Sequence, residues 1–466
     1  MMIMHERQNT SYEKISSVAQ RLGLPFEDVQ TAQKLIYDSS TECRRDHLGE
    51  PLPRYRYAIE ALSGEPTLPR QIIPQFDQLE TVLDTLLDAQ KNGAAPYGLD
   101  HVILPQDARN IPYELFSNDR DLANFFAVSC LWMRRTNSVK AMRALGNLYR
   151  DTRELDADPF DPHVAMTMDD ESILSMIAPY SQLQMRDFTV PAFRANAKYI
   201  TEAFGGDVRQ CYDQTEDYEE VCRRVKNRTG AARGPSKGLK GFDFKMVSML
   251  LYYLADADSI DRPGEKLMPY FDFPLPVDMH VARLSAGTGC VKLHGYDEGE
   301  NIMSSELTTI LRDMYYDYGV THGIGQLSIA DAVWLMGSWY CSYSPETFSV
   351  VKKLDKRKSL IAPYEPRYNH SRDASAWHAT CGSCPIAAQC THVAPGKVAQ
   401  ILGQIILRPR RQSIEQHSLF DNQDQHISAA ALDGLVRHAK NRGMHSSQEA
   451  KAANRTDNGQ PTLFEI

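Results

Sequence analysis

Apolar residues recur at helical spacing along most of the chain, whereas the alternation that is typical of strands is scarce. Three stretches show the helical spacing most clearly: 119–150, 182–204 and 245–255. The first of them is broken near Thr136 and Asn137. Ser328 and Asp331 resemble a capping box with Asp in the place of Glu, which predicts that a further helix begins at Ser328. The pattern as a whole predicts an all-α fold.

Two regions stand apart from these stretches. Residues 1–110 are predicted to form a separate helical segment of unassigned role, with proline-containing joints such as Leu52-Pro53. From residue 408 to residue 466 the chain is polar and enriched in Gln, Asn, Ser and His. Because such a composition buries little apolar surface, we expect a flexible tail there.

Length and composition are those of a soluble globular protein. The 466 residues suffice for two or three domains, and 42% of them are hydrophobic and 24% charged. No apolar run approaches the roughly 18 residues that span a bilayer, so we expect no membrane partner. The N-terminal sequence turns polar too early for a signal peptide. We therefore expect a cytoplasmic or nucleoid location, in which the 9 cysteines are thiols or ligands rather than disulfides.

The charge is unevenly distributed. A net charge of −9 and a pI near 5.9 argue against a strongly basic, non-specific nucleic-acid binder. Between Cys222 and Lys245, however, the chain carries eight basic residues, and Asp243 is the only acid. Such a cationic loop suits backbone phosphates, although a merely solvated loop is the alternative.

Four cysteines follow a short acidic motif. Residues 277–283 read Val-Asp-Met-His-Val-Ala-Arg. Downstream come Cys341 and then Cys381, Cys384 and Cys390, which form a CxxC pattern followed by five residues and a third cysteine. Thiolates at this spacing suit a metal ion or an iron–sulfur cluster.

A third motif lies upstream. Residues 239–245 read Leu-Lys-Gly-Phe-Asp-Phe-Lys, and the glycine suits a tight backbone turn. In this order, the three motifs resemble the helix-hairpin-helix base-excision DNA glycosylases of the endonuclease III and adenine glycosylase group. The resemblance implies a glycosylase domain over residues 115–395, with a cluster loop at 341–390 and residues 1–110 as an extra N-terminal region. It also implies an enzyme that cleaves the N-glycosidic bond of a damaged or modified base, with or without AP-lyase activity.

The subgroup, and with it the base, is left open. The sequence FDFPLPVDMHVARL at 271–284 and the long spacing between Lys245 and Asp278 are more similar to the archaeal 8-oxoguanine glycosylases, which lack the cluster. Arg134, Thr136 and Asn137 fall where the family has its base-probing turn, but the family's Gln is absent there. The resemblance therefore does not name the substrate base.

The resemblance implies two catalytic residues. Asp278 matches the aspartate that faces the sugar, where a fixed carboxylate stabilises the positive charge of the breaking glycosidic bond. Its alternative role is that of an ordinary helix N-cap, since Pro276 stops any earlier helix. Lys245 matches the nucleophilic lysine of bifunctional members, with Lys240 as the second choice. The alternative role of Lys245 is phosphate binding.

The resemblance also implies the DNA contacts. Gly241 matches a glycine of the family's hairpin, whose backbone N–H groups bind a phosphate, while Asp243 stands where a second glycine is usual. Lys237 and Lys240 precede this glycine as cations and are the other expected DNA contacts of the hairpin. Arg283 ends the acidic motif and is interpreted as structural or phosphate-contacting.

Four cysteines are the expected ligands of a [4Fe–4S] cluster: Cys341, Cys381, Cys384 and Cys390. The 39 residues between the first two exceed the family's short gap, and Cys290 is the alternative fourth ligand. Zinc is the alternative metal, because four thiolates suit it as well. The cluster is expected to be structural.

Two pentapeptides in the tail resemble the motif that binds the bacterial sliding clamp. Their matching residues are Gln416, Leu419 and Phe420 in one, and Gln460, Leu463 and Phe464 in the other. A Leu-Phe pair on a flexible tail can fill a hydrophobic pocket of a partner. The alternative is that the pair docks on its own chain.

Two other functions remain open beside the repair glycosylase. One is a base-modifying or phage-defence enzyme that uses the glycosylase fold on hypermodified DNA. The other is a non-catalytic DNA-binding protein that the sliding clamp recruits. Asp278 and Lys245 together favour an enzyme that acts on a base flipped out of duplex DNA.

Overall fold

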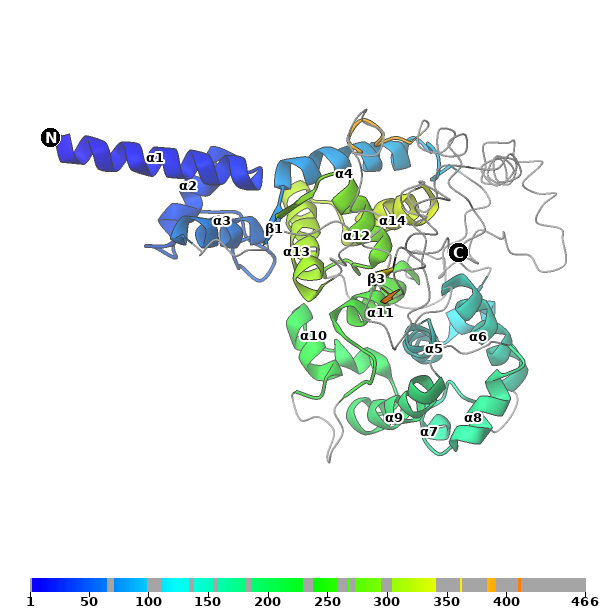
Figure 1. The fold of residues 1–466 in the computed structure, drawn as a ribbon. Coiled ribbons are helices and arrows are strands. Elements are labelled where there is room, and N and C mark those ends of the chain that lie inside the picture. Colours follow the sequence, from blue (N-terminus) through cyan, green and yellow to red (C-terminus); the bar gives the residue numbers. More distant parts are fainter. Residues whose placement is uncertain are drawn as a thin grey trace, which may run out of the picture. The chain divides into compact units, whose positions relative to one another are not determined.

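The fold is mostly helical, as the hydrophobic pattern predicted (Figure 1). The structure, a computed structural model, describes residues 2–64, 71–98, 110–133, 138–153, 158–180, 186–228, 238–257, 267–268, 273–294, 304–340, 361–362, 384–390 and 410–411. Within these residues the strands form two short two-stranded antiparallel sheets. The all-α class is therefore confirmed.

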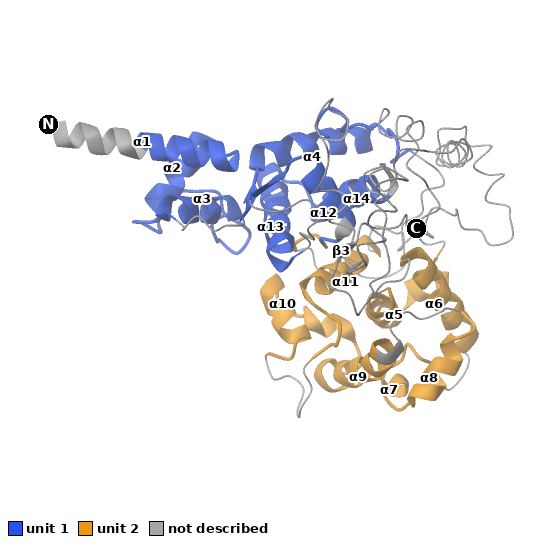
Figure 2. Cartoon of the chain, viewed as in Figure 1, with its two compact units in different colours: residues 1–102, 277–461 blue, residues 103–276, 462–466 orange. Residues whose placement is uncertain are grey.

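The chain divides into two compact units (Figure 2). Unit 1 comprises residues 1–102 and 277–461, and unit 2 comprises residues 103–276 and 462–466. The first 102 residues fall in the same unit as the acidic motif. The domain boundaries expected from the sequence stay a prediction.

Unit 1 is assembled from distant parts of the chain. Its elements are α1 (Met2–Leu22), α2 (Phe26–Leu35), α3 (Pro53–Ser63), β1 (Gln71–Pro74), α4 (Phe76–Lys91), α12 (Met279–Gly287), β2 (Val291–His294), α13 (Ser305–His322), α14 (Gln326–Leu335), the π-helical turn η3 (Met336–Tyr340), β3 (Ile361–Ala362) and β4 (Arg410–Arg411). Strand β1 pairs with β2 from Gln71 opposite His294 to Pro74 opposite Val291. Helix α13 packs against α3, α4, α12 and α14.

A buried ion pair also joins the N-terminal helices of unit 1 to α13. Arg54 of α3 donates to Asp317, with an Nε–Oδ1 distance of 2.7 Å, and to Asp28 of α2 at 2.9 Å. Arg54 is 5% exposed and Asp317 is 0% exposed. Burial alone would lower the pKa of Arg54, but hydrogen bonds to the two carboxylates outweigh it and raise the pKa.

Unit 2 is a helical unit built around a buried helix. Its elements are η1 (Tyr113–Ser117), α5 (Asp119–Trp132), α6 (Ser138–Thr152), α7 (Pro162–Ala165), α8 (Asp170–Ile177), α9 (Arg186–Phe204), η2 (Val208–Cys211), α10 (Tyr218–Val225) and α11 (Phe244–Ala257). Helix α5 packs against α6, α9 and α11. The structure agrees with the hydrophobic periodicity at three places: the break after α5, the helix that ends at Phe204 and the helix that includes 245–255.

The capping box expected at Ser328 is wrong. Helix α14 begins two residues earlier, at Gln326, and its N-cap is Gly325, which makes no side-chain cap. Helix α13 ends at the left-handed Gly323, so only a short link separates the two helices. Gln326 is buried and donates from Nε2 to the Tyr315 carbonyl at 3.3 Å, and this tertiary contact favours an earlier start than the local pattern indicated.

None of the helices in the described part of the chain combines the length and apolarity that crossing a membrane would require.

Candidate active site and nucleic-acid interface

Asp278 begins α12 as its N-cap. Its Oδ1 accepts hydrogen bonds from the backbone N–H groups of His280, at 2.8 Å, and Val281, at 3.1 Å. Pro274 and Pro276 lie in the irregular stretch that leads into this helix. The side chain of Asp278 is partly exposed. The expected capping role of Asp278 is therefore confirmed, and the cap holds one carboxylate oxygen against the first turn of the helix.

The second oxygen of Asp278 is held from another helix. Trp334 of α14 donates from Nε1 to Oδ2 at a distance of 3.2 Å. Three N–H groups thus point at one carboxylate. Sequence analysis did not indicate Trp334, because it lies 56 residues downstream and belongs to none of the three motifs.

The other polar residues of the acidic motif lie behind this carboxylate. Arg283 is 2% exposed, and its Nη2 lies 3.2 Å from Nδ1 of the partly exposed His280. The imidazole ring of His280 meets the Trp334 ring edge-on, with centroids 6.1 Å apart. A guanidinium enclosed in this way does not suit a direct phosphate contact, so the burial favours the structural alternative for Arg283 over DNA binding.

Gly337 lets η3 approach α12 closely. A Cβ atom at this position would lie 2.5 Å from the His280 carbonyl oxygen, nearer than real side chains come. Met336, the residue before it, is fully buried. The tight packing of η3 on α12 fixes the end of α14, which carries Trp334, relative to Asp278.

In unit 2, the hairpin sequence forms a tight turn between α10 and α11. The Leu239 carbonyl accepts from the Phe242 N–H at 3.4 Å, and Gly241 has a φ of +85°, a left-handed value that favours glycine. Leu239 and Phe242 are 4% and 5% exposed, so both ends of the turn are buried. Lys240 and Gly241 occupy its centre.

Asn196 of α9 holds the centre of this turn. Its Oδ1 accepts from the Lys240 N–H at 2.6 Å, and its Nδ2 donates to the Lys240 carbonyl at 3.0 Å. Asn196 is 6% exposed. One amide side chain therefore fixes both polar groups of a backbone position that the hairpin motif assigns to DNA contact.

Asp243 has a local role that explains the departure from the usual glycine. Its Oδ1 accepts from the Met246 N–H at 3.0 Å, so the side chain caps the first turn of α11. The hairpin thus passes directly into a helix whose N-terminal N–H groups point toward the turn.

Lys245 lies in that first turn and is partly exposed. Burial raises the pKa of the Cys130 thiol on α5, and the charge of Lys245 opposes this rise, which indicates that the ammonium lies near that helix. Lys245 belongs to unit 2, whereas Asp278 belongs to unit 1.

Neighbouring cations surround the turn unevenly. The Lys226 Nζ lies 3.8 Å from the centroid of the Phe244 ring, which is 37% exposed. Arg223 and Arg224 both pair with Glu220 instead. Part of the positive charge expected between Cys222 and Lys245 is therefore already neutralised within α10.

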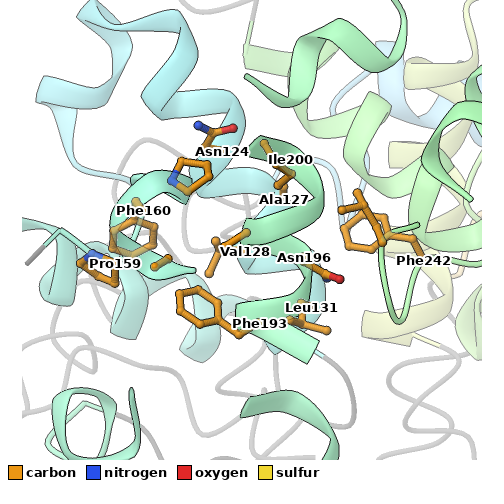
Figure 3. Close-up of a pocket in the computed structure, with 14 residues that line it drawn as sticks. Asn124, Ala127, Val128, Leu131, Pro159, Phe160, Phe193, Asn196, Ile200 and Phe242 are labelled. Atoms are coloured by element: carbon orange, nitrogen blue, oxygen red, sulfur yellow. The ribbon is translucent and has the colours of Figure 1, made fainter. Parts of the chain in front are cut away.

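Behind the turn lies a small apolar cavity of about 20 Å³ (Figure 3). Phe160 lines one side of it and Phe242 the other, and Asn196 also contributes. Its volume is close to the minimum that holds one water molecule, so this cavity is a packing gap and not a pocket for a base.

Two of the four expected ligand cysteines lie within the described residues. The Cys384 Sγ lies 3.7 Å from the Met336 Sδ, and the Cys390 N–H donates to the Ile386 carbonyl at 3.0 Å, in a turn that the buried Ile386 anchors. Burial raises the pKa of Cys384 to about 12, and the nearby Cys390 adds to the rise. This turn therefore lies beside Met336 of η3, and η3 ends at Tyr340, directly before Cys341.

Cys384 and Cys390 are two of the four thiols that the expected cluster requires. Cys341 and Cys381 fall outside the described residues, and among the residues that are described no group of three metal-binding side chains occurs. Cys290, the alternative ligand, is 0% exposed, and its Sγ lies 3.2 Å from the Thr288 hydroxyl. Burial raises its pKa to about 12.

Several expected site residues also fall outside the described part of the chain. They are Lys237, the residues of the base-probing turn (Arg134, Thr136 and Asn137) and both tail pentapeptides.

No family model, curated protein or solved structure matches this chain. The family resemblance rests on the three motifs.

Proposed function

We propose that this chain is a DNA glycosylase, which cleaves the N-glycosidic bond of a damaged or modified base. One observation carries the proposal: the partly exposed carboxylate of Asp278, which three N–H donors hold at the start of α12. It occupies the motif position at which the resembling enzymes have their catalytic aspartate.

The chemistry of base release explains why such a carboxylate is useful. Breaking the bond between base and sugar leaves positive charge on the sugar, and a fixed anion stabilises that charge without reorganising. The target base must first leave the stack, which costs a few kcal/mol. In this proposal Asp278 lies against the sugar and either stabilises its charge or activates the incoming nucleophile.

The turn at Lys240 and Gly241 supports DNA binding. A glycine in the left-handed conformation lets the backbone come close to a phosphate, and the first turn of α11 adds N–H groups and a favourable dipole. Lys226 and Lys240 supply cations near this turn. We assign the turn to one backbone phosphate of the DNA.

Lys245 decides whether the enzyme also has lyase activity. As a nucleophile it would attack the sugar carbon that loses the base and form a Schiff base. As a phosphate ligand it would change affinity but not chemistry.

The cysteine turn supports a [4Fe–4S] cluster in a structural role, with zinc as the alternative. Cys384 and Cys390 would supply two ligands, and the contact of Cys384 with Met336 joins their turn to η3. Such a group would hold the cysteine loop in place and supply no step of base release.

For the tail we propose binding to the bacterial sliding clamp through Leu419-Phe420 and Leu463-Phe464. A pull-down with purified clamp should lose the chain when Phe420→Ala and Phe464→Ala are combined. Undiminished capture of that double variant would contradict clamp binding through these motifs.

The test of the proposed function is borohydride trapping and base release on duplexes that carry a panel of lesions and modified bases. We expect wild type to release at least one base and Asp278→Asn to release none. A covalent adduct that Lys245→Ala loses would establish a bifunctional enzyme, whereas release without an adduct would establish a monofunctional one. Release from hypermodified DNA alone would favour a defence or modification role. Absence of both on every substrate would contradict the glycosylase and favour a binding protein.

A further inference from the structure

The second oxygen of Asp278 is held by a side chain that lies outside the acidic motif. Oδ1 is fixed by two backbone N–H groups of α12, but Oδ2 is fixed by the Trp334 indole of α14, at 3.2 Å. These three donors hold both oxygens of the carboxylate, and together they fix its plane.

The Trp334 ring is itself braced by the acidic motif. The His280 ring lies edge-on to it, at an interplanar angle of 76°. Because a guanidinium can only donate, the 3.2 Å contact with the buried Arg283 means that His280 Nδ1 accepts, which places the imidazole proton on Nε2. Arg283 thus orients His280, and His280 packs against Trp334.

The backbone reinforces the same arrangement. Gly337 comes three residues after Trp334, and η3 packs so closely on α12 at this glycine that no Cβ fits against the His280 carbonyl. The end of α14 is therefore held at a fixed distance from the N-terminus of α12. Side-chain and backbone contacts converge on the geometry of one hydrogen bond.

We propose that Trp334 is the positioning residue of the Asp278 carboxylate, fixing the plane in which the carboxylate faces the sugar. This inference rests on the proposed glycosylase function. It also gives His280 and Arg283 a role in the motif, since both brace the indole and neither contacts the substrate. The rival role is a gate, in which the indole blocks Oδ2 and must leave before the reaction.

The first arm of the test is spectroscopic and needs no substrate. In the full chain labelled with ¹⁵N-tryptophan, the Trp334 indole N–H resonance is assigned by its loss in Trp334→Phe. Because a charged acceptor makes a stronger hydrogen bond than a neutral amide, Asp278→Asn should move this resonance upfield. Trp132, whose buried Nε1 has no partner in the structure, serves as the internal reference that should not move. A Trp334 resonance that is insensitive to Asp278→Asn would overturn the proposal.

The second arm is kinetic and uses a duplex that carries the base released from the panel of lesions and modified bases. Trp334→Phe keeps most of the ring but removes the donor, and misplacement of a catalytic group typically costs up to about 100-fold in rate. We expect the single-turnover rate at saturating DNA to fall about 10- to 100-fold, with DNA affinity changed less than about 2-fold. An unchanged rate would overturn positioning, and a faster rate would establish the gate.

The two arms separate this inference from the proposed function. If wild type releases no base from any duplex, the glycosylase proposal fails, and a positioning role for catalysis fails with it. The spectroscopic arm still reports in that case whether the indole contact exists. If base release requires Asp278 but ignores Trp334→Phe, the glycosylase stands and only the positioning role is wrong.

Discussion

At the scale of single residues, Asp243 and Asp278 begin helices by the same local chemistry but stand in different surroundings. Asp243 is exposed and caps α11 through one N–H group, that of Met246. Asp278 caps α12 and also receives the Trp334 indole. Capping depends on neighbours in sequence, so it could be predicted for Asp278. The indole contact could not, because it depends on how two distant helices pack.

Arg283 shows the same limit of prediction from local sequence. The motif suggested either a structural or a phosphate-contacting arginine, and the choice depends on burial. Its 2% exposure results from the packing of α12 against α13, α14 and η3, which no heptapeptide specifies. The hairpin was more predictable, since a left-handed glycine follows from local turn chemistry.

The amide of Asn196 supplies a prediction at this scale. Asn196→Asp keeps an acceptor for the Lys240 N–H but places an oxygen against the Lys240 carbonyl, where Nδ2 now donates. Replacing this part-buried hydrogen bond by a contact between two oxygens should cost about 1 kcal/mol in the free energy of unfolding. Duplex binding should also depend less steeply on salt. The slope of the logarithm of the binding constant against the logarithm of the salt concentration should fall by about 1, which corresponds to one lost phosphate contact. Urea unfolding and fluorescence anisotropy measure the two effects.

Asn147→Asp is the matched control for that variant, because Asn147 is exposed on α6, where its Oδ1 accepts from Arg150 at 3.0 Å. Both properties should stay unchanged in the control. Equal behaviour of the two variants would show that Asn196 does not hold the turn.

At the scale of elements, the packing of η3 on α12 fixes the carboxylate site from behind. Three contacts arise from four consecutive residues. Trp334 contacts Asp278, Met336 contacts Cys384, and Gly337 lies against the His280 backbone. One short segment therefore connects the carboxylate with the cysteine turn.

Gly337→Ala tests this packing. Its added Cβ would meet the His280 carbonyl at 2.5 Å, so α12 and η3 must move apart. Overpacking of this kind should destabilise the chain by about 1–3 kcal/mol. Ser338→Ala, in the same turn, should change stability by less than about 0.5 kcal/mol. Urea unfolding of both variants decides, and a Gly337→Ala chain as stable as Ser338→Ala would contradict the close packing.

At the scale of the whole molecule, unit 1 brings together segments that the sequence separates by about half of the chain. The β1–β2 ladder and the ion pair between Arg54 and Asp317 both join the N-terminal helices to the region after residue 277. Periodicity predicted the helices of these segments. Their association could not be predicted, because it depends on pairing between residues more than 200 positions apart.

Arg54→Met tests how firmly these segments are joined. It leaves the fully buried Asp317 without its main partner, and an uncompensated buried charge typically costs about 3–5 kcal/mol. Arg56→Met, two residues on, breaks the ion pair between the half-exposed Arg56 and Asp313, and it should cost less than about 1 kcal/mol. The comparison uses urea unfolding. A similar small loss of stability in both variants would contradict a stabilising buried ion pair at Arg54.

The cysteine loop gives a prediction about metal content. Chain purified without oxygen should contain about four iron and four sulfide per molecule, and Cys384→Ser should lose both. Cys290→Ser should keep them, because the Cys290 thiol is enclosed beside Thr288. Elemental analysis with a sulfide assay distinguishes the cases: zinc without sulfide would establish the alternative metal, and loss of iron in Cys290→Ser would make Cys290 a ligand.

The most direct test of the central claim compares two aspartates that both cap helices. Asp278→Asn and Asp169→Asn each remove one charge and keep a good N-cap, since Asn caps about as well as Asp. Single-turnover base release is measured on the duplex that wild type cleaves. We predict that Asp278→Asn lowers the rate at least about 100-fold while Asp169→Asn matches wild type. A rate for Asp278→Asn equal to that of Asp169→Asn would contradict the catalytic role of this carboxylate.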